Sequence, residues 1–273
     1  AVAKEAMQAV TPIGLVALRF AIATVCLLPF VRSSGPGAAR RTLVPGLIAG
    51  AVLGAGYFLQ MSGIRETTAS TGGFLAGLIV LLVAFGGYLF FGARFGVQSL
   101  LGLGLGVVGL VLVCLPSAGD DGQRTDTLRG IVLQIGSSTA FAGHILLLSH
   151  YGRGLPIAAF AFWQLLVVTI VGLVLVPLTG GLGVGGEPFA PDSNALLAIA
   201  YLGILPTAVG IGVQAKVQHR IPPTPLALLF ALLPLLAALF GWLLQGDRLG
   251  VMQWSGGALI VTGVVITSLS RPR

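Results

Sequence analysis

The sequence predicts an all-α integral membrane protein with ten transmembrane helices, arranged as two inverted repeats of five helices each. Three observations predict this fold: a composition poor in charge, apolar runs of membrane-spanning length, and an internal repeat. Of the 273 residues, 56% are hydrophobic and 8% are charged, whereas a soluble domain carries about 25% charged residues. Because so few charges cannot cover a water-facing surface, we expect lipid to surround the protein.

Long apolar runs divide the chain into spans. A helix needs about 20 apolar residues to cross roughly 30 Å of hydrocarbon. The runs are 12–31, 43–63, 67–91, 97–115, 128–149, 156–179, 194–215, 222–245 and 251–270. Residues 1–8 resemble the end of one more span, so we expect that the first of the ten helices is truncated in this chain.

An internal repeat relates the two halves of the sequence. Residues 92–113 and 246–267 match at a constant shift of 154 positions, and each copy has an apolar run, a Gly-x-Arg-x-Gly-Val turn and a second apolar run. The copies lie five spans apart, and an odd number of spans per repeat gives the halves opposite orientations in the membrane. We therefore expect a first repeat at 1–117, a linker at 118–127 and a second repeat at 128–273.

The charges of the loops predict the orientation of the chain. Cytoplasmic loops of membrane proteins carry an excess of Lys and Arg. If both termini are cytoplasmic, nine basic residues lie inside and five outside, and all eight acidic residues lie outside. The inside set is Arg32, Arg40, Arg41, Arg94, Arg153, Lys216, Arg220, Arg271 and Arg273, and the outside set is Lys4, Arg65, Arg124, Arg129 and Arg248. Basic residues scattered in this way argue against a nucleic-acid-binding surface.

Glycines recur at every fourth position in two spans. Gly46, Gly50 and Gly54 share one face of the run 43–63, and Gly102 and Gly106 repeat the spacing in the run 97–115. Such spacing lets two helix backbones approach closely. We expect these faces to be helix-packing surfaces.

Two ionisable residues, Arg19 and His144, stand well inside apolar runs. Such residues are expensive in hydrocarbon and therefore suggest function. Arg19 is suited to bind a substrate carboxylate through its forked guanidinium, or to clamp backbone carbonyls. His144 is able to carry a proton near neutral pH, which suggests proton coupling, or to serve as a hydrogen-bonded packing residue. The sequence leaves both pairs of alternatives open.

Neutral polar residues are more plentiful inside the spans. Gln60 and Gln214 are equivalent at the shift of 154, so the repeat predicts that they face one central cavity from two sides, with interhelical hydrogen bonding as the alternative. Such a cavity suits small amphipathic or zwitterionic solutes better than inorganic ions. The sequence contains no metal-ligand cluster, phosphate loop or Ser/His/Asp constellation, so we expect no cofactor, no metal and no enzymatic activity.

Several short motifs, in order along both halves, resemble those of the EamA-type permeases of the drug/metabolite transporter superfamily. The resemblance covers nearly the whole chain, although Asp247 and Ala93 stand where the family's turn has glutamate, and Val80 where its first half has proline. The motifs are Val2-Ala3-Lys4-Glu5-Ala6 followed by Thr11-Pro12, Leu18-Arg19-Phe20, Leu233-Pro234, Gly241-Trp242-Leu243-Leu244, Gly246-Asp247-Arg248-Leu249 and Gly256-Gly257-Ala258-Leu259-Ile260.

The resemblance implies a bacterial inner-membrane carrier that exports amino acids or related metabolites by alternating access through a central cavity. In relatives, spans one, three, four, six, eight and nine line this cavity. With Arg19 added, the candidate substrate-binding residues are Arg19, Tyr57, Gln60, Thr71, Gln134, Ser138, His144, Tyr201, Thr207 and Gln214.

Several alternatives stay open beside amino-acid export. They are broad-specificity drug or metabolite efflux, a nucleotide-sugar-like carrier, and a membrane sensor or assembly subunit that transports nothing. A carrier of phosphorylated solutes needs several cavity cations, for which Arg19 is the sole candidate in the visible spans. The expected partners are a small-molecule substrate and the lipid bilayer, with a monomer or homodimer as the assembly.

Overall fold

The described part of the chain is entirely helical. The computed structural model describes residues 6–7, 9–63, 66–67, 69–92, 96–114, 127–152, 154–217, 220 and 250–269. Its elements are α2 (Pro12–Arg32), α3 (Ala38–Gly63), α4 (Ala69–Phe91), α5 (Val97–Cys114), α6 (Leu128–Tyr151), α7 (Ile157–Leu178), the 3₁₀ turn η1 (Val184–Gly186), α8 (Ser193–Leu202), the π-helix η2 (Gly203–Val209), α9 (Gly210–Val217) and α11 (Val251–Leu269).

The helices follow the apolar runs of the sequence closely. The largest difference is in α3, which begins at Ala38 rather than at residue 43 and includes Arg40 and Arg41. Charged residues limit the hydrocarbon-buried part of a helix, but they do not end the helix itself. The expected span at 222–245 lies outside the described residues, as does most of the stretch 1–8.

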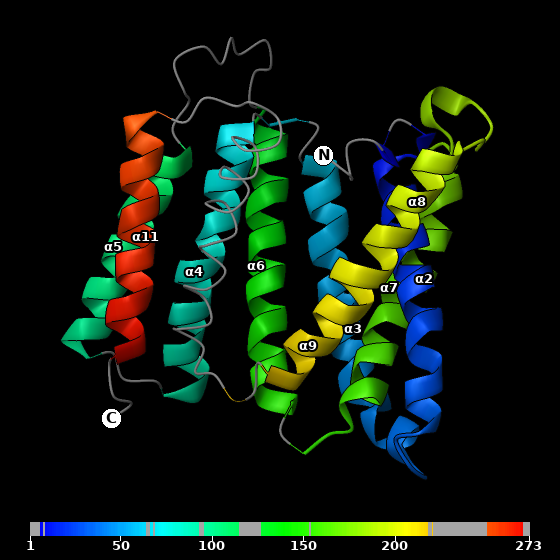
Figure 1. The fold of residues 1–273 in the computed structure, drawn as a ribbon, viewed down its shortest axis with the longest axis horizontal. Helices are drawn as coiled ribbons and strands as arrows, with labels where there is room; N and C mark the ends of the chain where they lie inside the picture. The colour runs from blue at the N-terminus through cyan, green and yellow to red at the C-terminus, as the bar shows by residue number, and fades with distance from the viewer. Residues whose placement is uncertain are drawn as a thin grey trace. The chain divides into compact units, whose positions relative to one another are not determined.

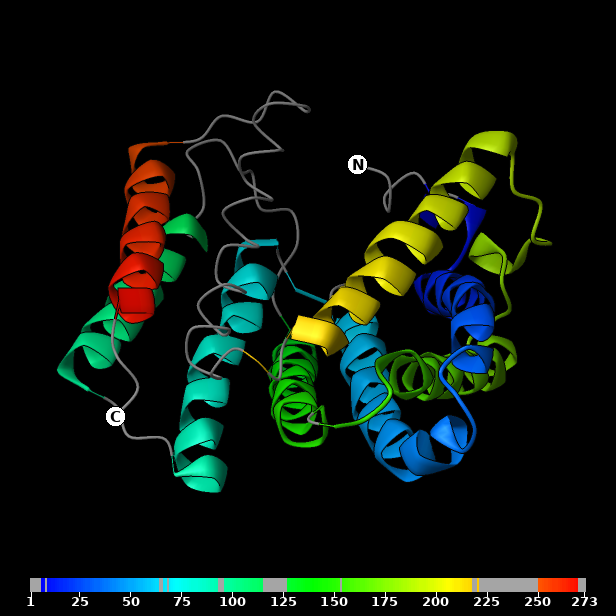
Figure 2. The same cartoon turned by 60° about the horizontal axis from the view of Figure 1, so that its bottom comes forward.

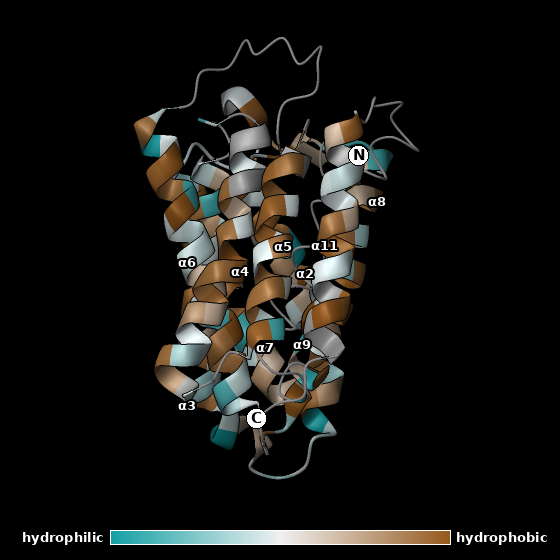
Figure 3. Ribbon diagram, turned by 90° about the vertical axis from the view of Figure 1, so that its left-hand side faces the viewer, coloured by the Kyte–Doolittle hydropathy of each residue, from teal (hydrophilic) through white to brown (hydrophobic). Residues whose placement is uncertain are grey.

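Five described helices are long and apolar enough to cross a membrane. Two shorter apolar stretches accompany them, Leu75–Phe90 within α4 and Val97–Leu112 within α5. Hydrophobic residues dominate the helices, and hydrophilic ones are sparse along them (Figure 3). The five long spans are Pro12–Arg32, Ala38–Gly63, Leu128–Tyr151, Ile157–Leu178 and Ser193–Val217.

The chain forms two compact units, and each unit combines segments from both halves of the sequence. The first unit comprises Ala1–Met61 and Leu147–Arg220, and the second comprises Ser62–Leu146 and Ile221–Arg273. The segment Ser62–Leu146 of the second unit runs across the predicted linker at 118–127 and into the predicted second repeat. The units therefore do not coincide with the predicted sequence repeats.

Side-chain caps fix the helix ends in the first unit. Thr11 caps α2 by accepting a hydrogen bond from the Gly14 amide (3.2 Å), and its hydroxyl donates to the Gly181 carbonyl (3.0 Å). Asp192 caps α8 by accepting from the Ala195 amide (2.8 Å). Such caps satisfy amides that the first helical turn leaves unpaired. Beneath them an apolar core joins Ala6, Val10, Leu15, Ala198, Ile199 and Leu202.

Two helix pairs hold the first unit together. The glycine face of α3 packs on α7, where a Cβ on Gly46 would lie 2.5 Å from the Trp163 Cβ and one on Gly50 would lie 2.8 Å from the Gln164 Cα. This contact confirms the packing role predicted for these glycines. Helices α2 and α7 also lie side by side (Figures 1 and 2), and the buried hydroxyls of Thr24 and Thr169 are 3.2 Å apart.

In the second unit α5 and α11 are in close contact. A Cβ on Gly109 would lie 2.5 Å from the Gly256 carbonyl oxygen, and a Cβ on Gly263 would lie 2.5 Å from the Gly102 carbonyl oxygen. Figures 1 and 2 both show the two helices side by side. Since the residue number rises along one helix as it falls along the other, the pair is antiparallel. The glycines therefore let the two backbones touch.

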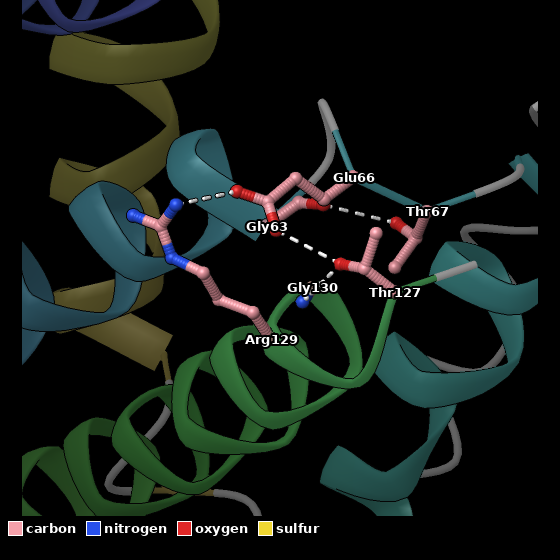
Figure 4. Close-up of polar contacts among 6 residues, drawn as sticks. All are labelled: Gly63, Glu66, Thr67, Thr127, Arg129 and Gly130. Carbon is pink, nitrogen blue, oxygen red and sulfur yellow. Dashed lines mark hydrogen bonds and ion pairs between the residues drawn. The ribbon is translucent and has the colours of Figure 1, made fainter. Parts of the chain in front are cut away.

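A polar cluster joins the α3–α4 connection to the start of α6 in the second unit (Figure 4). Thr127 caps α6 through the Gly130 amide (2.9 Å) and donates its hydroxyl to Glu66 Oε2 (2.8 Å). Arg129 pairs with Glu66 Oε1 at 3.0 Å, although 77% of its side chain is exposed. The cluster fixes two chain segments that are 61 residues apart.

Candidate functional site

The first unit contains a partly buried cation in contact with two aromatic rings. The Arg19 Cζ lies 4.6 Å from the Tyr57 ring centre and 5.2 Å from that of Phe20. The two rings pack edge to face, with centres 5.0 Å apart. Arg19 Nε is buried and has no hydrogen-bond partner among the described residues. The structure thus brings two predicted site residues, Arg19 and Tyr57, into direct contact.

The depth of this arginine makes its position costly. Arg19 is seven residues after Pro12, the start of α2, and therefore about 10 Å along the helix axis. Placing an arginine at the centre of a membrane helix costs about 2.5–3.5 kcal/mol on insertion scales. A cation–π contact returns about 0.5–2 kcal/mol, depending on how far the pair is removed from water. The rings thus offset part of the cost but leave the buried Nε–H donor unsatisfied.

A π-helix lies against α2 beside this arginine. A Cβ on Gly203, the first residue of η2, would lie 3.1 Å from the Arg19 carbonyl oxygen. Within η2, Pro206 has no amide hydrogen to donate, and the hydroxyl of buried Thr207 donates to the Leu202 carbonyl at 2.7 Å. Single π turns inside α-helices are frequent at functional sites. Thr207, another predicted residue, thus stabilises an irregular turn of its own helix.

The other predicted residues of the first unit differ in exposure. Gln60 on α3 and Gln214 on α9 are both partly buried. Tyr201 on α8 is 50% exposed. That Gln60 and Gln214 face one cavity stays a prediction.

In the second unit, three predicted residues, Gln134, Ser138 and His144, form a buried polar face on α6 together with Ser137. Gln134, Ser137, Ser138 and His144 are each at most 2% exposed, and their spacing puts them on one side of the helix. Ser138 donates its hydroxyl to the Leu75 carbonyl of α4 at 2.7 Å. These residues place hydrogen-bonding groups along an otherwise apolar membrane helix.

Some features of these sites escaped the sequence analysis, and others fall outside the structure. Phe20 follows Arg19 directly, and no sequence pattern showed that its ring would stack with Tyr57. The use of the Leu75 carbonyl as an acceptor also left no signal in the sequence. The side chain of Thr71 and the motif Leu233-Pro234 lie outside the described residues. The described residues contain no group of three or more His, Cys, Asp or Glu side chains that could hold a metal ion.

Comparison with known proteins identifies the family. Residues 1–115 and 128–269 match the EamA-like transporter family. The chain belongs to this family. A solved crystal structure with 21% sequence identity superposes with a TM-score of 0.81, over 98% of this chain and 91% of its own, and shows that the two share a fold.

Individual EamA-family relatives are transporters. The chain is 27% identical to "Uncharacterized transporter YdfC" of Bacillus subtilis (strain 168), over 97% of this chain and 85% of that protein. It is 25% identical to an "Uncharacterized transporter" of Archaeoglobus fulgidus, over 98% of this chain and 80% of that protein. It is 27% identical to the "Probable amino-acid metabolite efflux pump" of Escherichia coli (strain K12), over 64% of this chain and 59% of that protein.

The family assignment confirms several predictions at a coarse level. The chain is a multi-pass membrane transporter with a helical fold, and its family and relatives are transporters rather than enzymes. The predicted resemblance to EamA-type permeases is confirmed. The number of spans, the inverted repeat, the substrate and the orientation stay predictions.

Proposed function

We propose that this chain is a secondary-active transporter of the bacterial inner membrane, with ten spans in two inverted repeats, that exports amino acids or related small metabolites by alternating access. The family supports transport, and the Escherichia coli relative is named for amino-acid metabolite efflux. Each unit has polar groups inside its membrane helices, Arg19 in the first and the buried polar residues of α6 in the second, and these support a transport role. Polar groups inside membrane spans typically mark substrate paths.

The contact between α5 and α11 supports the inverted repeat on which the proposed alternating-access mechanism rests. Gly109 meets Gly256, and Gly102 meets Gly263. Adding 154 to the numbers in the first helix converts Gly102 to Gly256 and Gly109 to Gly263, so each contact becomes the other. Two antiparallel segments that exchange in this way are related by a local two-fold axis across their length. This supports an inverted repeat, the architecture in which one half rocks against the other.

The transport proposal is tested with purified full-length protein in proteoliposomes. We expect saturable counterflow of one or more members of a panel of amino acids and their metabolites. Flux of unrelated drugs with equal efficiency would favour broad efflux instead. Absence of flux for every solute, from vesicles in which the protein is folded, would contradict transport and favour a sensor or assembly role.

We propose that both termini are cytoplasmic, as the loop charges predict. Exposed Ser33 then lies inside and exposed Glu187 lies outside. In a background with Cys26→Ala and Cys114→Ala, a membrane-impermeant maleimide should label Glu187→Cys in intact cells from the outside once the outer membrane is permeabilised. Ser33→Cys should be labelled after the inner membrane is opened, and the reverse pattern would overturn the orientation.

We propose His144 as the proton-carrying residue of the transport cycle. It is buried on α6, and α4, which packs on α6 through Ser138, carries no Asp, Glu, Lys, Arg or His. His144→Gln should abolish the pH dependence of transport while substrate binding persists. The matched control is His150→Gln, which changes an exposed histidine at the end of the same helix. An unchanged pH profile in His144→Gln would assign His144 to packing.

A further inference from the structure

We infer that Arg19, in contact with the rings of Tyr57 and Phe20, binds the carboxylate group of the transported solute, and that a charged amine is not needed for recognition. The inference rests on the proposed transport function and specifies its substrate class as small organic carboxylates. It arises from three features of the first unit: the depth of the arginine, the unused hydrogen-bond donor, and the lack of a carboxylate side chain in the described spans.

The depth of the site separates Arg19 from water at the membrane surface. Arg19 lies about 10 Å from the start of α2, and Tyr57 lies about 9 Å from the end of α3 at Gly63, counting along the helix axes. The two helices bring these residues together at a similar depth. A surface arginine extends its side chain toward water, whereas the guanidinium of Arg19 lies over the Tyr57 ring inside the unit.

The aromatic contacts leave the edge of the guanidinium at Nε without a hydrogen bond. A ring stacked on a guanidinium interacts with its face, whereas the five N–H donors point outward in its plane. Nε is buried without a partner among the described residues. Since Nε–H and a neighbouring terminal N–H form a fork that matches the two oxygens of a carboxylate, the free edge has the geometry of a carboxylate site.

No side chain of the described spans supplies that carboxylate. The described helices α2 to α9 and α11 contain no Asp or Glu, and Asp192 is engaged in capping α8. Arg19 itself is only partly buried, so its side chain is not sealed from a small solute. The missing counter-charge is therefore one that a substrate can bring.

The same inventory argues against cations and phosphates as substrates. An ammonium group would find no carboxylate in the described spans, and the Tyr57 and Phe20 rings already hold a cation. A phosphate group carries close to two negative charges at neutral pH, and Arg19 is a single, partly buried guanidinium. A single carboxylate matches a single guanidinium, so removal of the amine from an amino acid should not prevent its recognition.

The test compares matched solutes and matched variants in proteoliposomes. The solutes are the standard amino acids, their 2-oxo acids, their amides and their decarboxylated amines. We expect counterflow of some amino acids together with the corresponding 2-oxo acids, and at least tenfold less for the amides and amines. Arg19→Gln should lower carboxylate flux at least tenfold, while Arg32→Gln, at the exposed end of the same helix, should not.

A second measurement separates ligand binding from a structural role. In detergent, a transported carboxylate should raise the melting temperature of the wild type and of Arg32→Gln, but not that of Arg19→Met, since a ligand stabilises the state that binds it. Without ligand, Arg19→Met should melt no lower than the wild type. Arg19→Lys should show a reduced ligand response, because an ammonium keeps the charge but lacks the fork.

The outcomes distinguish the two proposals. Wild-type flux that is insensitive to Arg19→Gln, or equal flux of amides or amines, overturns the carboxylate inference and leaves transport standing. If the Arg19 variants do not fold, the wild-type solute comparison decides. Flux that requires the carboxylate supports the inference, whereas flux that does not require it makes Arg19 a structural clamp. A wild type that moves no solute of the panel refutes the proposed transport function, and the inference falls with it.

Discussion

Two glycine-lined helix contacts, one in each unit, are built in different ways. In the first unit, α3 supplies Gly46 and Gly50, and α7 fills the space with Trp163 and the backbone of Gln164. Residue numbers rise together along this pair, so the helices are parallel. In the second unit, α5 and α11 are antiparallel, and both present glycines to each other.

The difference follows from the relation between the partners. The inverted repeat that the sequence predicts would place Gly102 and Gly109 of one copy against each other's counterparts in the second copy, so both helices would present small residues at the contact. Helices α5 and α11 satisfy this condition with the pairs Gly109–Gly256 and Gly102–Gly263. Where the partners are not repeat copies, as with α3 and α7, one helix can supply the groove and the other the side chains that fill it.

The largest expected effect comes from breaking the reciprocal contact. Gly109→Ala and Gly263→Ala each put a Cβ 2.5 Å from a backbone oxygen of the facing helix, and overpacking costs about 1–3 kcal/mol. Each should therefore lower the melting temperature in detergent, and by similar amounts. Gly104→Ala, with no atom within 4 Å of its added Cβ, is the control on the same helix and should not lower it. Destabilisation by one of the pair alone would contradict the exchange relation.

A smaller effect is expected within the α3–α7 contact. A Cβ on Gly50 would meet the Gln164 Cα and carbonyl oxygen at 2.8 Å, whereas one on Gly54 would find its nearest neighbour at an ordinary 3.5 Å. Gly50→Ala should cost about 1–2 kcal/mol, since overpacking outweighs the gain in helix propensity. Gly54→Ala should be neutral or slightly stabilising in the same thermal melt. Equal effects at both positions would show that α7 shifts to accommodate either methyl group.

The hydroxyl pair between α2 and α7 sharpens the comparison, because it adds a polar contact to a helix pair in which Gly172 also packs closely on Ala17. The buried hydroxyls of Thr24 and Thr169 are 3.2 Å apart, and either one can donate to the other. Each hydroxyl is also within hydrogen-bond distance of the carbonyl four residues earlier in its own helix. A double-mutant cycle with Thr24→Val and Thr169→Val should give a coupling of about 0.6 kcal/mol, the average for such bonds in membranes. A coupling near zero would mean that the intrahelical acceptors suffice.

The smallest effect is expected at the Glu66–Arg129 ion pair. Arg129 is largely exposed, and surface ion pairs contribute about 0–1 kcal/mol that salt screens. Arg129→Gln should change the melting temperature little, and the change should vanish in high salt. Thr127→Val should cost more, because it removes both the cap of α6 and the bond to Glu66. A larger loss for Arg129→Gln than for Thr127→Val would reverse this ranking.

Much of the helical organisation could be predicted because its causes are local. The run of apolar residues 157–178 specifies a span regardless of its neighbours, since the cost of exposing backbone to lipid enforces a helix. The glycine faces at Gly46, Gly50 and Gly54 were also readable, because their spacing depends only on the period of the helix. The EamA-like family followed from the order of short motifs along the chain.

Tertiary structure decided which of these residues meet. The sequence placed Arg19 and Tyr57 in separate spans, and the packing of α2 on α3 put the guanidinium over the ring and left its Nε–H without a partner among the described residues. Helix propensity cannot reveal that arrangement, because it depends on the rotation of two helices about their axes. The exchange of Gly109–Gly256 with Gly102–Gly263 likewise required coordinates. Hydropathy and periodicity are properties of one segment, whereas a binding geometry is a property of several.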